Sequence, residues 1–387
     1  MLTSLLKKLS FLSALSILAV SFSFSVNAES FRSGAKQAIL FDFSSGTVLF
    51  EKNADERMGP SSMTKIMTTY IIFDALKNGD FTLDSKFKVS KKAWKKGGSK
   101  MFVEAGSYIR LENLIKGIVV QSGNDACIVV AEGFSKTEEA FAKDMNYMAE
   151  RLGLENTNFT NSTGWPDENH YSTARDMAIL SKRIIQDFPE YYDYFNQQVF
   201  TWSDITQRNR NTLLGKEGLG VDGLKTGHTE QAGYGIVVSA VQNGRRLVAL
   251  VNGLNSEKRR ISEAERLLMH GFNDFKPERL FEKNEIVEKV KVWGGENSYV
   301  PVAARKPVEL IIERRKQVRP DYKLEVIHNE PWIAPIEAGT HMATLVVKKD
   351  DKIISQYPLF ATRAVSEAGF LKRVYDKFIT LTGLEIL

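Results

Sequence analysis

The alternation of apolar and polar positions divides the chain into four stretches of different character. Residues 1–28 carry one apolar run, and residues 29–284 mix strand-length apolar runs with helical periodicity. Residues 285–363 contain only short apolar or alternating runs, which glycines and prolines interrupt, and residues 364–387 return to a helical repeat. This pattern predicts an α+β protein in which a mixed domain precedes a small all-β domain and a C-terminal amphipathic helix.

Within the mixed domain, the pattern predicts a hairpin at the start and several helices. The hairpin spans Gln37–Phe50 and turns at Ser44-Ser45-Gly46, and a helix follows Pro60 and runs to Ala75. Two strands are expected between Gly235 and Val251, on either side of the Asn243-Gly244 turn. Further helices are predicted over Leu111–Phe134, Thr137–Leu152, Ala174–Asp187 and Ile261–Phe272, and the segment Asn156–Tyr171 is expected to be a loop.

In the β-rich domain, Thr344–Val347 and Ile353-Ile354 flank a charged turn and predict another hairpin. The final segment is different, because its apolar side chains gather on one arc of about 140° when a helix is stepped at 100° per residue. That arc holds Phe370, Leu371, Val374, Tyr375, Phe378 and Leu381, and the opposite side holds Lys372, Arg373, Asp376, Lys377 and Thr380.

Five charged residues between Glu367 and Lys377 exclude a membrane-spanning helix. A terminal amphipathic helix with aromatic residues on its apolar side suits the surface of a membrane. Docking of the same helix on its own protein, or on a second copy, is the alternative. We expect residues 364–387 to associate with the inner-membrane surface.

The N-terminal stretch has the pattern of a secretory signal peptide. Lys7 and Lys8 precede the apolar run from Leu12 to Phe24, and Val26-Asn27-Ala28 offers small residues for cleavage. A retained membrane anchor is the alternative, although the run is short for a spanning helix. Secretion with the single cysteine Cys127 favours a bacterial periplasm over a disulfide-linked extracellular protein.

Composition narrows the classes of function. The 387 residues are 43% hydrophobic and 26% charged, which excludes disordered and polytopic membrane proteins. Fifty-two basic and 47 acidic residues give a net charge of +5 without a concentrated basic stretch, so no nucleic acid is expected. The five histidines and the one cysteine show no metal-ligand spacing, and neither a metal nor another cofactor is expected.

The first candidate for chemistry is Ser62-Met63-Thr64-Lys65. Residues three apart on a helix share a side, and a serine needs a base before it becomes a good nucleophile. A lysine with its ordinary pKa of about 10.4 is protonated at neutral pH. Lys65 therefore serves as that base only if burial or a neighbouring cation lowers its pKa by roughly three units.

Two further motifs follow along the chain. Ser122-Gly123-Asn124 places a hydroxyl and an amide two residues apart on a turn, and Lys225-Thr226-Gly227 places a cation and a hydroxyl on a predicted edge strand. The second pair suits a substrate carboxylate, and the glycine is expected to let a ligand approach the backbone. Each tripeptide is common by chance, so their order along the chain carries more weight than each one alone.

Ser-x-x-Lys, Ser-x-Asn and Lys-Thr-Gly in this order resemble the set shared by penicillin-binding proteins and serine β-lactamases. Within that group, residues 36–275 closely resemble low-molecular-mass, serine-type D-alanyl-D-alanine carboxypeptidases, and the resemblance extends loosely to the C-terminus. It implies a β-lactamase/penicillin-binding-protein-like transpeptidase fold, with an antiparallel sheet flanked by helices and a helical subdomain. The matching stretches are Gln37–Leu40, Glu51–Glu56, Gln121–Cys127, Ser172–Ala178, Asn209–Asn211 and Val221–Thr229.

The resemblance also implies a role for each motif residue. Ser62 would attack the penultimate D-alanine of a peptidoglycan stem peptide and form an acyl-enzyme, with Lys65 as base and Lys225 as the cation that keeps it neutral. Ser122 would relay a proton to the leaving amine, and Asn124 would bind the peptide backbone. The remaining residues implied are Lys225, Thr226, Gly227, Arg210 and Arg260 around the terminal carboxylate, and the backbone N–H groups of Ser62 and His228 as the oxyanion hole.

By the same resemblance, β-lactams would acylate Ser62, and the protein would be periplasmic and peripherally attached to the inner membrane. Three other functions remain open. A class A β-lactamase needs a loop glutamate in a Glu-x-x-Leu-Asn context, which is absent between Gly153 and Tyr171. An inactive penicillin-binding scaffold and an endopeptidase that cuts crosslinks are the others. One departure is that no histidine stands near Thr163-Gly164-Trp165, where the family often has one.

Overall fold

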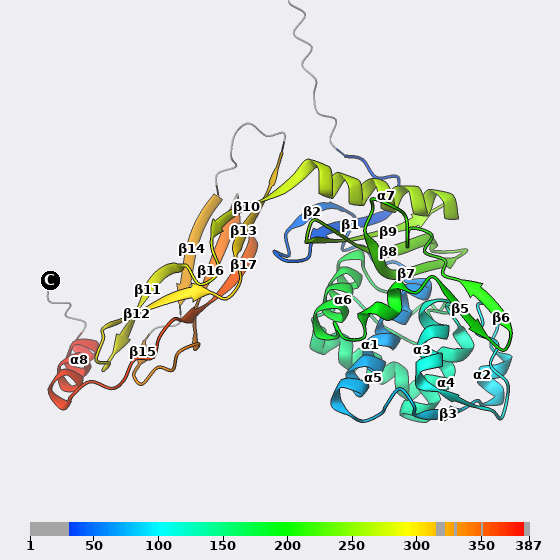
Figure 1. Ribbon diagram of the computed structural model, residues 1–387, viewed down its shortest axis with the longest axis horizontal. Helices are drawn as coiled ribbons and strands as arrows, with labels where there is room; N and C mark the ends of the chain where they lie inside the picture. Colours follow the sequence, from blue (N-terminus) through cyan, green and yellow to red (C-terminus); the bar gives the residue numbers. More distant parts are fainter. Residues whose placement is uncertain (1–30, 315–321, 329–330, 350, 383–387) are drawn as a thin grey trace, which may run out of the picture. The chain divides into compact units, whose positions relative to one another are not determined.

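The computed structural model describes residues 31–314, 322–328, 331–349 and 351–382. The predicted signal peptide, residues 1–28, lies outside this part of the chain. The described residues form an α+β protein, as the pattern of apolar positions predicts (Figure 1). A mixed domain comes first, and a domain built almost entirely of strands follows it along the chain.

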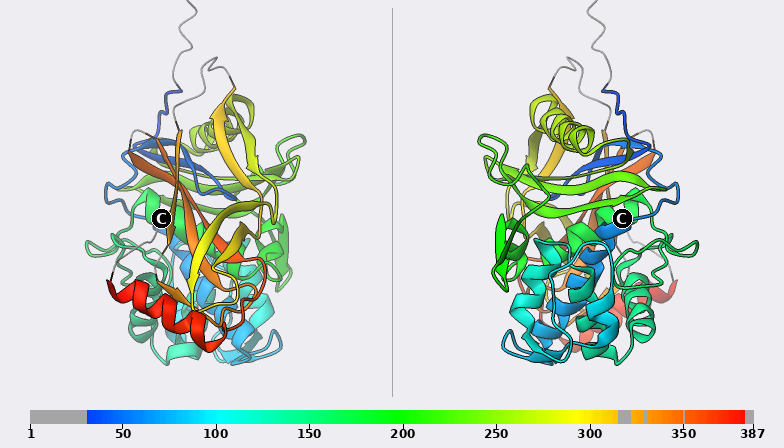
Figure 2. Two further views of the ribbon diagram at one scale, coloured as in Figure 1. Left: turned by 90° about the vertical axis from the view of Figure 1, so that its left-hand side faces the viewer. Right: turned by 90° about the vertical axis from the view of Figure 1, so that its right-hand side faces the viewer.

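A five-stranded antiparallel sheet is the centre of the mixed domain, and its strand order is β2-β1-β9-β8-β7. Helix α7 packs against β8 and β9 on one face, and α6 packs against β1 and β9 on the other (Figures 1 and 2). Because both faces are covered, the central strands are rich in apolar residues, and every residue of β1 is buried. The strands are β1 Gln37–Asp42, β2 Val48–Lys52, β7 Val221–Thr229, β8 Gly233–Gln242 and β9 Arg245–Leu254.

Both predicted hairpins of this domain are confirmed. Strands β8 and β9 turn at Asn243 and Gly244, whose φ angles of 51° and 77° fit the type I′ turn that an Asn-Gly pair favours. Strands β1 and β2 pair with a bulge between Leu40 and Phe41. In the finished sheet β7 is an edge strand, so one side of its backbone stays available to a ligand.

Helices form most of the rest of the mixed domain, and several of them begin at a capping side chain. Thr137, Thr173 and Ser256 accept hydrogen bonds from the backbone N–H three residues on. The predicted helices over residues 137–152, 174–187 and 261–272 are confirmed, the last within a longer helix. The elements are η1 Ser61–Thr64, α1 Lys65–Asn78, α2 Lys91–Lys95, α3 Leu111–Val119, α4 Asn124–Ser135, α5 Glu138–Leu152, α6 Ala174–Asp187, η2 Tyr192–Asn196 and α7 Glu257–Asp274.

The prediction of one helix over residues 111–134 is wrong. The structure has two helices, α3 and α4, because the chain turns sharply between them. Ser122 takes a left-handed φ of 59°, and the backbone N–H of Gly123 donates to the carbonyl of Gly117. A Cβ on Gly123 would lie 3.0 Å from the backbone nitrogen of Met101, so the turn leaves no room for a side chain there.

Four short strands in this domain were not predicted. Strand β3 (Lys86–Lys88) pairs with β4 (Tyr108–Arg110), and β5 (Val199–Trp202) pairs with β6 (Ile205–Arg208). Segments of three or four residues are too short for an alternating pattern to stand out from chance. The β5–β6 hairpin is followed directly by Asn209-Arg210-Asn211, so it positions one of the candidate cations.

The second domain is built from strands. Its larger sheet has the order β14-β16-β17-β12-β11-β15, and β10 pairs with β13 in a smaller one. The predicted hairpin is β16–β17, and a core of valines and leucines, including Val302 and Leu345, fills the domain. The strands are β10 Phe275–Phe281, β11 Ile286–Trp293, β12 Tyr299–Ala304, β13 Val308–Glu313, β14 Tyr322–His328, β15 Trp332–Ile333, β16 His341–Lys349 and β17 Lys352–Ala361.

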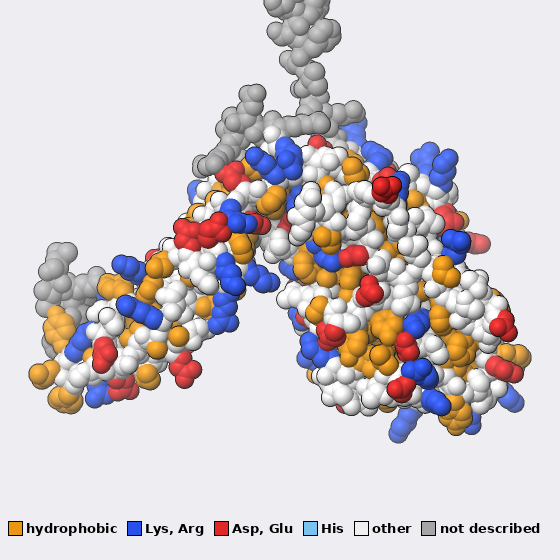
Figure 3. All heavy atoms as spheres, viewed as in Figure 1, with side chains coloured by type: hydrophobic (Ala, Val, Ile, Leu, Met, Phe, Trp, Pro, Cys, Tyr) orange, Lys and Arg blue, Asp and Glu red, His pale blue; other side chains and the backbone are white. Residues whose placement is uncertain are grey.

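The terminal helix α8 (Phe370–Thr382) uses its polar side to contact the β-rich domain. Lys372 donates to the carbonyl of Gly295 at 2.6 Å, and the Gly294 N–H donates to Asp376 at 2.8 Å. Phe370 and Leu371 are 71% and 83% exposed, and apolar side chains gather over this helix in Figure 3. The side chains of Phe378 and Leu381 lie outside the described part. In the described residues, no helix has the length and apolar character required to cross a membrane.

Candidate active site

The structure brings Ser62 and Lys65 into direct contact. Ser62 lies in the single 3₁₀ turn η1, and Lys65 is the first residue of α1, so the two side chains share one side of a continuous helical segment. The Lys65 Nζ atom donates to the Ser62 Oγ atom at 2.8 Å. Ser62 is partly exposed, whereas Lys65 is fully buried, so the hydroxyl is the member of the pair that a substrate can reach.

The surroundings of Lys65 favour its neutral form. Its Nζ also donates to the Asn124 side-chain oxygen at 2.8 Å and to the Thr163 carbonyl at 2.6 Å. Burial lowers the pKa of Lys65 from its ordinary value to about 8, and the positive charges of Arg210 and Lys96 act in the same direction. A lysine with a pKa near 8 has a usable neutral fraction at pH 7 and can accept a proton.

Two groups near Lys65 that could carry negative charge offer little compensation. Burial raises the pKa of the Cys127 thiol to about 12, so this sulfur is uncharged at physiological pH. The Asp125 carboxylate is buried and already accepts hydrogen bonds from the backbone N–H groups of Met101, Phe102 and Val103. Every hydrogen bond described for the Lys65 ammonium therefore goes to an uncharged oxygen.

Ser122 and Asn124 differ in their hydrogen bonding although they are two residues apart. Asn124 begins α4, and its amide bridges Lys65 and the Gly97 carbonyl, to which it donates at 2.9 Å. Ser122 lies in the turn before α4 and is fully buried, and its hydroxyl has no hydrogen-bond partner among the described residues. A buried hydroxyl without a partner is costly in a protein interior, so Ser122 is a polar group that the described contacts leave unexplained.

The third motif lies on the edge strand β7. Lys225 and Thr226 are each 3% exposed, and burial lowers the pKa of Lys225 well below its ordinary value, with Lys65, Arg210 and Arg260 acting in the same direction. The glycine of this motif also has a packing role. A Cβ on Gly227 would lie 2.9 Å from the Pro60 carbonyl, so this glycine lets η1 pack against β7.

Three further candidate residues surround β7. Arg210 donates to the Ser99 hydroxyl at 2.7 Å and stays exposed at its other end. The His228 ring stacks on Tyr234 with 3.8 Å between centroids, and the Arg260 guanidinium lies 5.7 Å from the same tyrosine ring. Arg260 is buried and pairs with Glu257, but its Nε atom has no partner among the described atoms.

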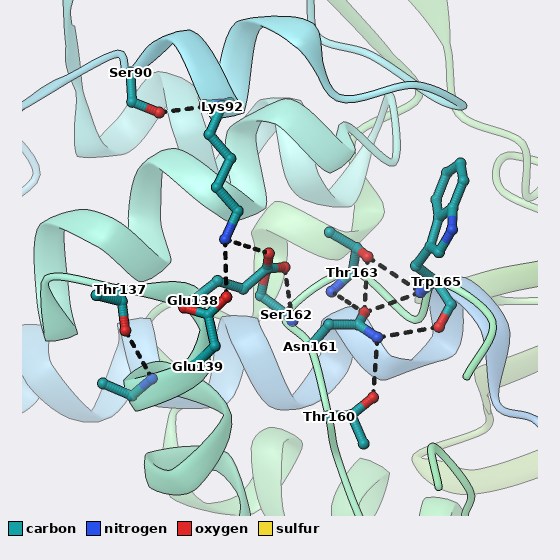
Figure 4. Close-up of polar contacts among 12 residues, drawn as sticks. Ser90, Lys92, Thr137, Glu138, Glu139, Thr160, Asn161, Ser162, Thr163 and Trp165 are labelled. Carbon is teal, nitrogen blue, oxygen red and sulfur yellow. Dashed lines mark hydrogen bonds and ion pairs between the residues drawn. The ribbon is translucent and has the colours of Figure 1, made fainter. Parts of the chain in front are cut away.

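The loop that carries the Thr163 carbonyl is fixed by a dense set of contacts (Figure 4). Asn161 accepts hydrogen bonds from the backbone N–H groups of residues 163–165, and the Ser162 hydroxyl donates to Glu138 at 2.9 Å. Glu138 in turn pairs with Lys92 at 3.3 Å. The loop thus holds an acceptor against Lys65, while Glu138 is engaged by Ser162 and Lys92.

His170 and Gly164 hold this loop against the nucleophile's helix. The His170 Nδ1 atom accepts from the Thr160 N–H at 3.1 Å, so its Nε2–H donates to the Thr64 hydroxyl at 2.8 Å. Burial lowers the pKa of His170 to about 4, which keeps the ring neutral. Gly164 has a φ of 79°, and a Cβ there would lie 1.8 Å from the Ser61 carbonyl oxygen.

A cleft of about 590 Å³ opens over the nucleophile. It is lined by Ser62, Ser99, Asn124, Thr163, Trp165 and His228, among others. The structure therefore brings together the first two motifs at Lys65, and places the third beside them on β7. A hydroxyl, a base with a lowered pKa and a cluster of buried cations suit attack on a carbonyl next to a carboxylate.

Sequence reasoning did not identify several residues that shape this site. The Thr163 carbonyl acts through its backbone, Gly164 acts by lacking a side chain, and Ser99 and Tyr234 act by supporting a neighbour. None of these contributions depends on a motif. The one available signal was Thr163-Gly164-Trp165 itself, which lies in the predicted loop before the Ser172–Ala178 stretch.

The fold and the site define a serine hydrolase in which lysine, and not histidine, contacts the nucleophile. The family described as D-alanyl-D-alanine carboxypeptidase matches residues 24–256, and the family described as penicillin-binding protein 5, C-terminal domain, matches residues 275–367. The chain belongs to the D-alanyl-D-alanine carboxypeptidase family, as a low-molecular-mass penicillin-binding protein.

Three relatives illustrate the similarity. D-alanyl-D-alanine carboxypeptidase DacC of Escherichia coli is 39% identical over 351 residues, which cover 88% of this chain and 87% of that protein. The crystal structure of penicillin binding protein 5 from Haemophilus influenzae has a TM-score of 0.77 and 35% identity, and covers 87% of this chain and 99% of its own. A Listeria monocytogenes penicillin-binding protein, solved in an ampicillin-bound form, has a TM-score of 0.58 and 26% identity over 63% of this chain and 99% of its own. The predicted fold class is confirmed.

Proposed function

We propose that the protein removes the terminal D-alanine from peptidoglycan stem peptides through an acyl-enzyme on Ser62. The observation that carries this assignment is the 2.8 Å contact between the Ser62 hydroxyl and the buried amine of Lys65. A serine needs such a base, and burial supplies the lowered pKa that the base needs. The family and the curated relatives support the reaction, and the contact between Ser62 and Lys65 supports the roles assigned to these two residues.

In the acylation step, the Ser62 oxygen attacks the carbonyl carbon of the penultimate D-alanine while neutral Lys65 takes the hydroxyl proton. The backbone N–H groups of Ser62 and His228 hold the resulting oxyanion, and each such donor contributes about 3–4 kcal/mol to lowering the barrier. Breaking the peptide C–N bond releases D-alanine, whose amine receives its proton through Ser122. Water then attacks the ester carbonyl and restores the Ser62 hydroxyl.

The terminal carboxylate of the substrate would bind at the cations around β7. Lys225 and Thr226 offer an ammonium and a hydroxyl, and Arg210 and Arg260 add positive charge nearby. The described hydrogen bond of the Lys225 ammonium goes to the Thr226 carbonyl, which is uncharged. A substrate carboxylate would supply the ion-pair partner that Lys225 and Arg210 lack among the described residues, which gives a reason for cutting next to a free C-terminus.

Covalent labelling and product release test the assignment directly. Wild type and the Ser61→Ala control are expected to bind fluorescent penicillin and to release D-alanine from a pentapeptide that ends in D-Ala-D-Ala. Ser62→Ala is expected to do neither, while its melting temperature stays close to that of wild type. Persistent labelling of Ser62→Ala would refute the assignment.

We also propose that β-lactams acylate Ser62 and that the resulting acyl-enzyme is hydrolysed slowly. The ampicillin-bound Listeria relative supports the first part. For the second part, the loop beside Lys65 presents a carbonyl of Thr163 in place of a carboxylate, and Glu138 is engaged by Ser162 and Lys92. Rapid hydrolysis of benzylpenicillin in a spectrophotometric assay would instead support a β-lactamase.

The proposed organisation assigns catalysis to residues 29–284, a separate β-rich domain to 285–363 and membrane association to 364–387. One refinement concerns β10, because its pairing with β13 makes it part of the β-rich domain, which would then begin near residue 275. The proposed location is the periplasm, at the inner-membrane surface. The polar contacts of α8 with Gly294 and Gly295 support this, since they leave Phe370 and Leu371 exposed.

A further inference from the structure

A second cavity, of about 420 Å³, adjoins the catalytic cleft and has no role in the mechanism above. The two hollows share Gly164, Trp165 and Pro166 on one wall and Thr229 and Gln231 on the other. Its far side is formed by Arg57 and by the segment that leads to η1. The hydrogen bonds between the backbones of Met58 and Ser172 hold this side in place.

The direction of the substrate along β7 leads into this second cavity. If the terminal carboxylate lies at Lys225 and Thr226 and the scissile carbonyl lies at Ser62 and His228, the peptide runs along β7 in the sense of rising residue number. The next position along that line is Thr229, which lines both hollows. The residue that precedes the two D-alanines therefore arrives at the shared wall, with its side chain beside the second cavity.

Charged groups of both signs line this cavity. Asp167 and Glu168 are exposed on the loop, and Arg57 is exposed opposite, with its guanidinium 4.1 Å from the centre of the Tyr171 ring. Among the described residues, none of these three forms an ion pair, although Asp167 accepts one hydrogen bond from the Asn169 N–H. The cleft proper differs, because the side chains that act on Lys225 there are chiefly basic ones, namely Lys65, Arg210 and Arg260.

We propose that the second cavity is a subsite for the side chain of the third stem-peptide residue, and that it recognises a side chain ending in an ammonium and a carboxylate. Asp167 and Glu168 bind the ammonium, and Arg57 binds the carboxylate. The stacking of Arg57 on Tyr171 restricts the guanidinium in advance and so reduces the entropy lost on binding. This inference rests on the proposed function, because it takes the position of the substrate from it.

The experiment compares three pentapeptides that end in D-Ala-D-Ala and differ in the third residue. That residue is meso-diaminopimelate, with ammonium and carboxylate; lysine, with ammonium alone; or Nε-acetyl-lysine, with neither. For the full-length mature protein we expect kcat/KM for D-alanine release to fall in this order, by about tenfold in total, which corresponds to 1.4 kcal/mol. Equal values for the three peptides would overturn the proposal.

Two variants separate the charged groups. Asp167→Asn/Glu168→Gln is expected to lower kcat/KM about threefold for the diaminopimelate and lysine peptides, which is the ammonium's share of the tenfold range, and to leave the acetyl-lysine peptide unchanged. Arg57→Gln is expected to lower it for the diaminopimelate peptide alone. Glu190→Gln, an exposed carboxylate outside both cavities, is the matched control. Equal losses for all three peptides would overturn the proposal.

The rate of acylation by benzylpenicillin distinguishes this proposal from the proposed function. Penicillin lacks the third residue, so all variants are expected to acylate at the wild-type rate, and a drop would show that the substitutions disturb the catalytic cleft and not a subsite. If wild type releases D-alanine from none of the three peptides, the proposed function fails. If it releases D-alanine from all three equally well, only the subsite fails.

Discussion

Gly164 offers a sharp test of how the loop beside Lys65 supports catalysis. In Gly164→Ala, the new Cβ would lie 1.8 Å from the Ser61 carbonyl oxygen, whereas ordinary contact begins at 3.4 Å. The difference, 3.4 minus 1.8, requires a displacement of about 1.6 Å. Thr163 is the adjacent residue, and its carbonyl lies 2.6 Å from the Lys65 Nζ atom, so a shift of that size breaks this hydrogen bond.

Three terms set the expected magnitude. A left-handed alanine costs roughly 1–2 kcal/mol, and the loss of a buried hydrogen bond adds about 1–3 kcal/mol. These two stability terms together predict a loss of roughly 2–5 kcal/mol. In a domain of this size, each kcal/mol lost lowers the melting temperature by about 2–4 °C. A misplacement of about 1 Å near a reacting group costs on the order of a hundredfold in rate. We therefore expect acylation by fluorescent penicillin to slow by about that factor.

Gly79→Ala is the matched control, because Gly79 has nearly the same φ, 80°, and a Cβ there meets nothing within 4 Å. It carries the backbone strain without the contact, so a loss of roughly 1–2 kcal/mol and an unchanged acylation rate are expected. Both variants are measured by thermal unfolding and by stopped-flow labelling. If Gly164→Ala melts together with Gly79→Ala and acylates at the wild-type rate, the argument about the loop is wrong.

Three other predictions follow from the charges and exposed surfaces. With the pKa of Lys65 at about 8, the second-order rate of penicillin acylation should rise about tenfold per pH unit below pH 8 and level off above it; a flat profile between pH 6 and 8 would exclude Lys65 as the base. The pKa of His170 falls from 6.5 to about 4 on folding, so its neutral ring stabilises the fold above pH 6.5, and about 3 kcal/mol is lost as the pH falls to 4. Urea unfolding at several pH values should show this slope, and His170→Asn should remove it. Finally, Phe370→Glu/Leu371→Glu should shift the mature protein from membranes to the soluble fraction, as deletion of residues 364–387 should, and unchanged fractionation would reject membrane association through α8.

The sequence predicted the elements whose signals are local and strong. The Asn243-Gly244 turn defines its hairpin, and caps such as Thr137 and Thr173 mark where helices begin. The break between α3 and α4 could not be read from periodicity, because apolar residues continue on both sides of Ser122. The structure adds the features that fix the turn, namely the hydrogen bond from the Gly123 N–H to the Gly117 carbonyl and the lack of space for a Cβ on Gly123 beside Met101.

In the candidate site, too, some features could be predicted from the sequence and others could not. Ser62 and Lys65 share a helical segment, so their contact could be predicted from spacing. The resemblance implied that Asn124 binds the peptide backbone, but its contact with Lys65 was not predicted. The acceptor at Thr163 could not be predicted, because any residue type supplies a backbone carbonyl. The packing role of Gly227 could not be predicted for a related reason, because the Pro60 carbonyl that a Cβ would meet is far from it in the sequence.

The four backbone hydrogen bonds to Asp125 have a mechanical consequence. Its carboxylate accepts from the N–H groups of residues 101–103 and from that of Ala126, which ties the loop after Ser99 to the start of α4. Ser99 and Asn124 are therefore held in a fixed position relative to each other on one side of the cleft. The Trp165 ring packs against this same side of the cleft, because the Lys96 Nζ atom lies 4.3 Å from its centre, so the loop before Ser99 links Trp165 to the start of α4.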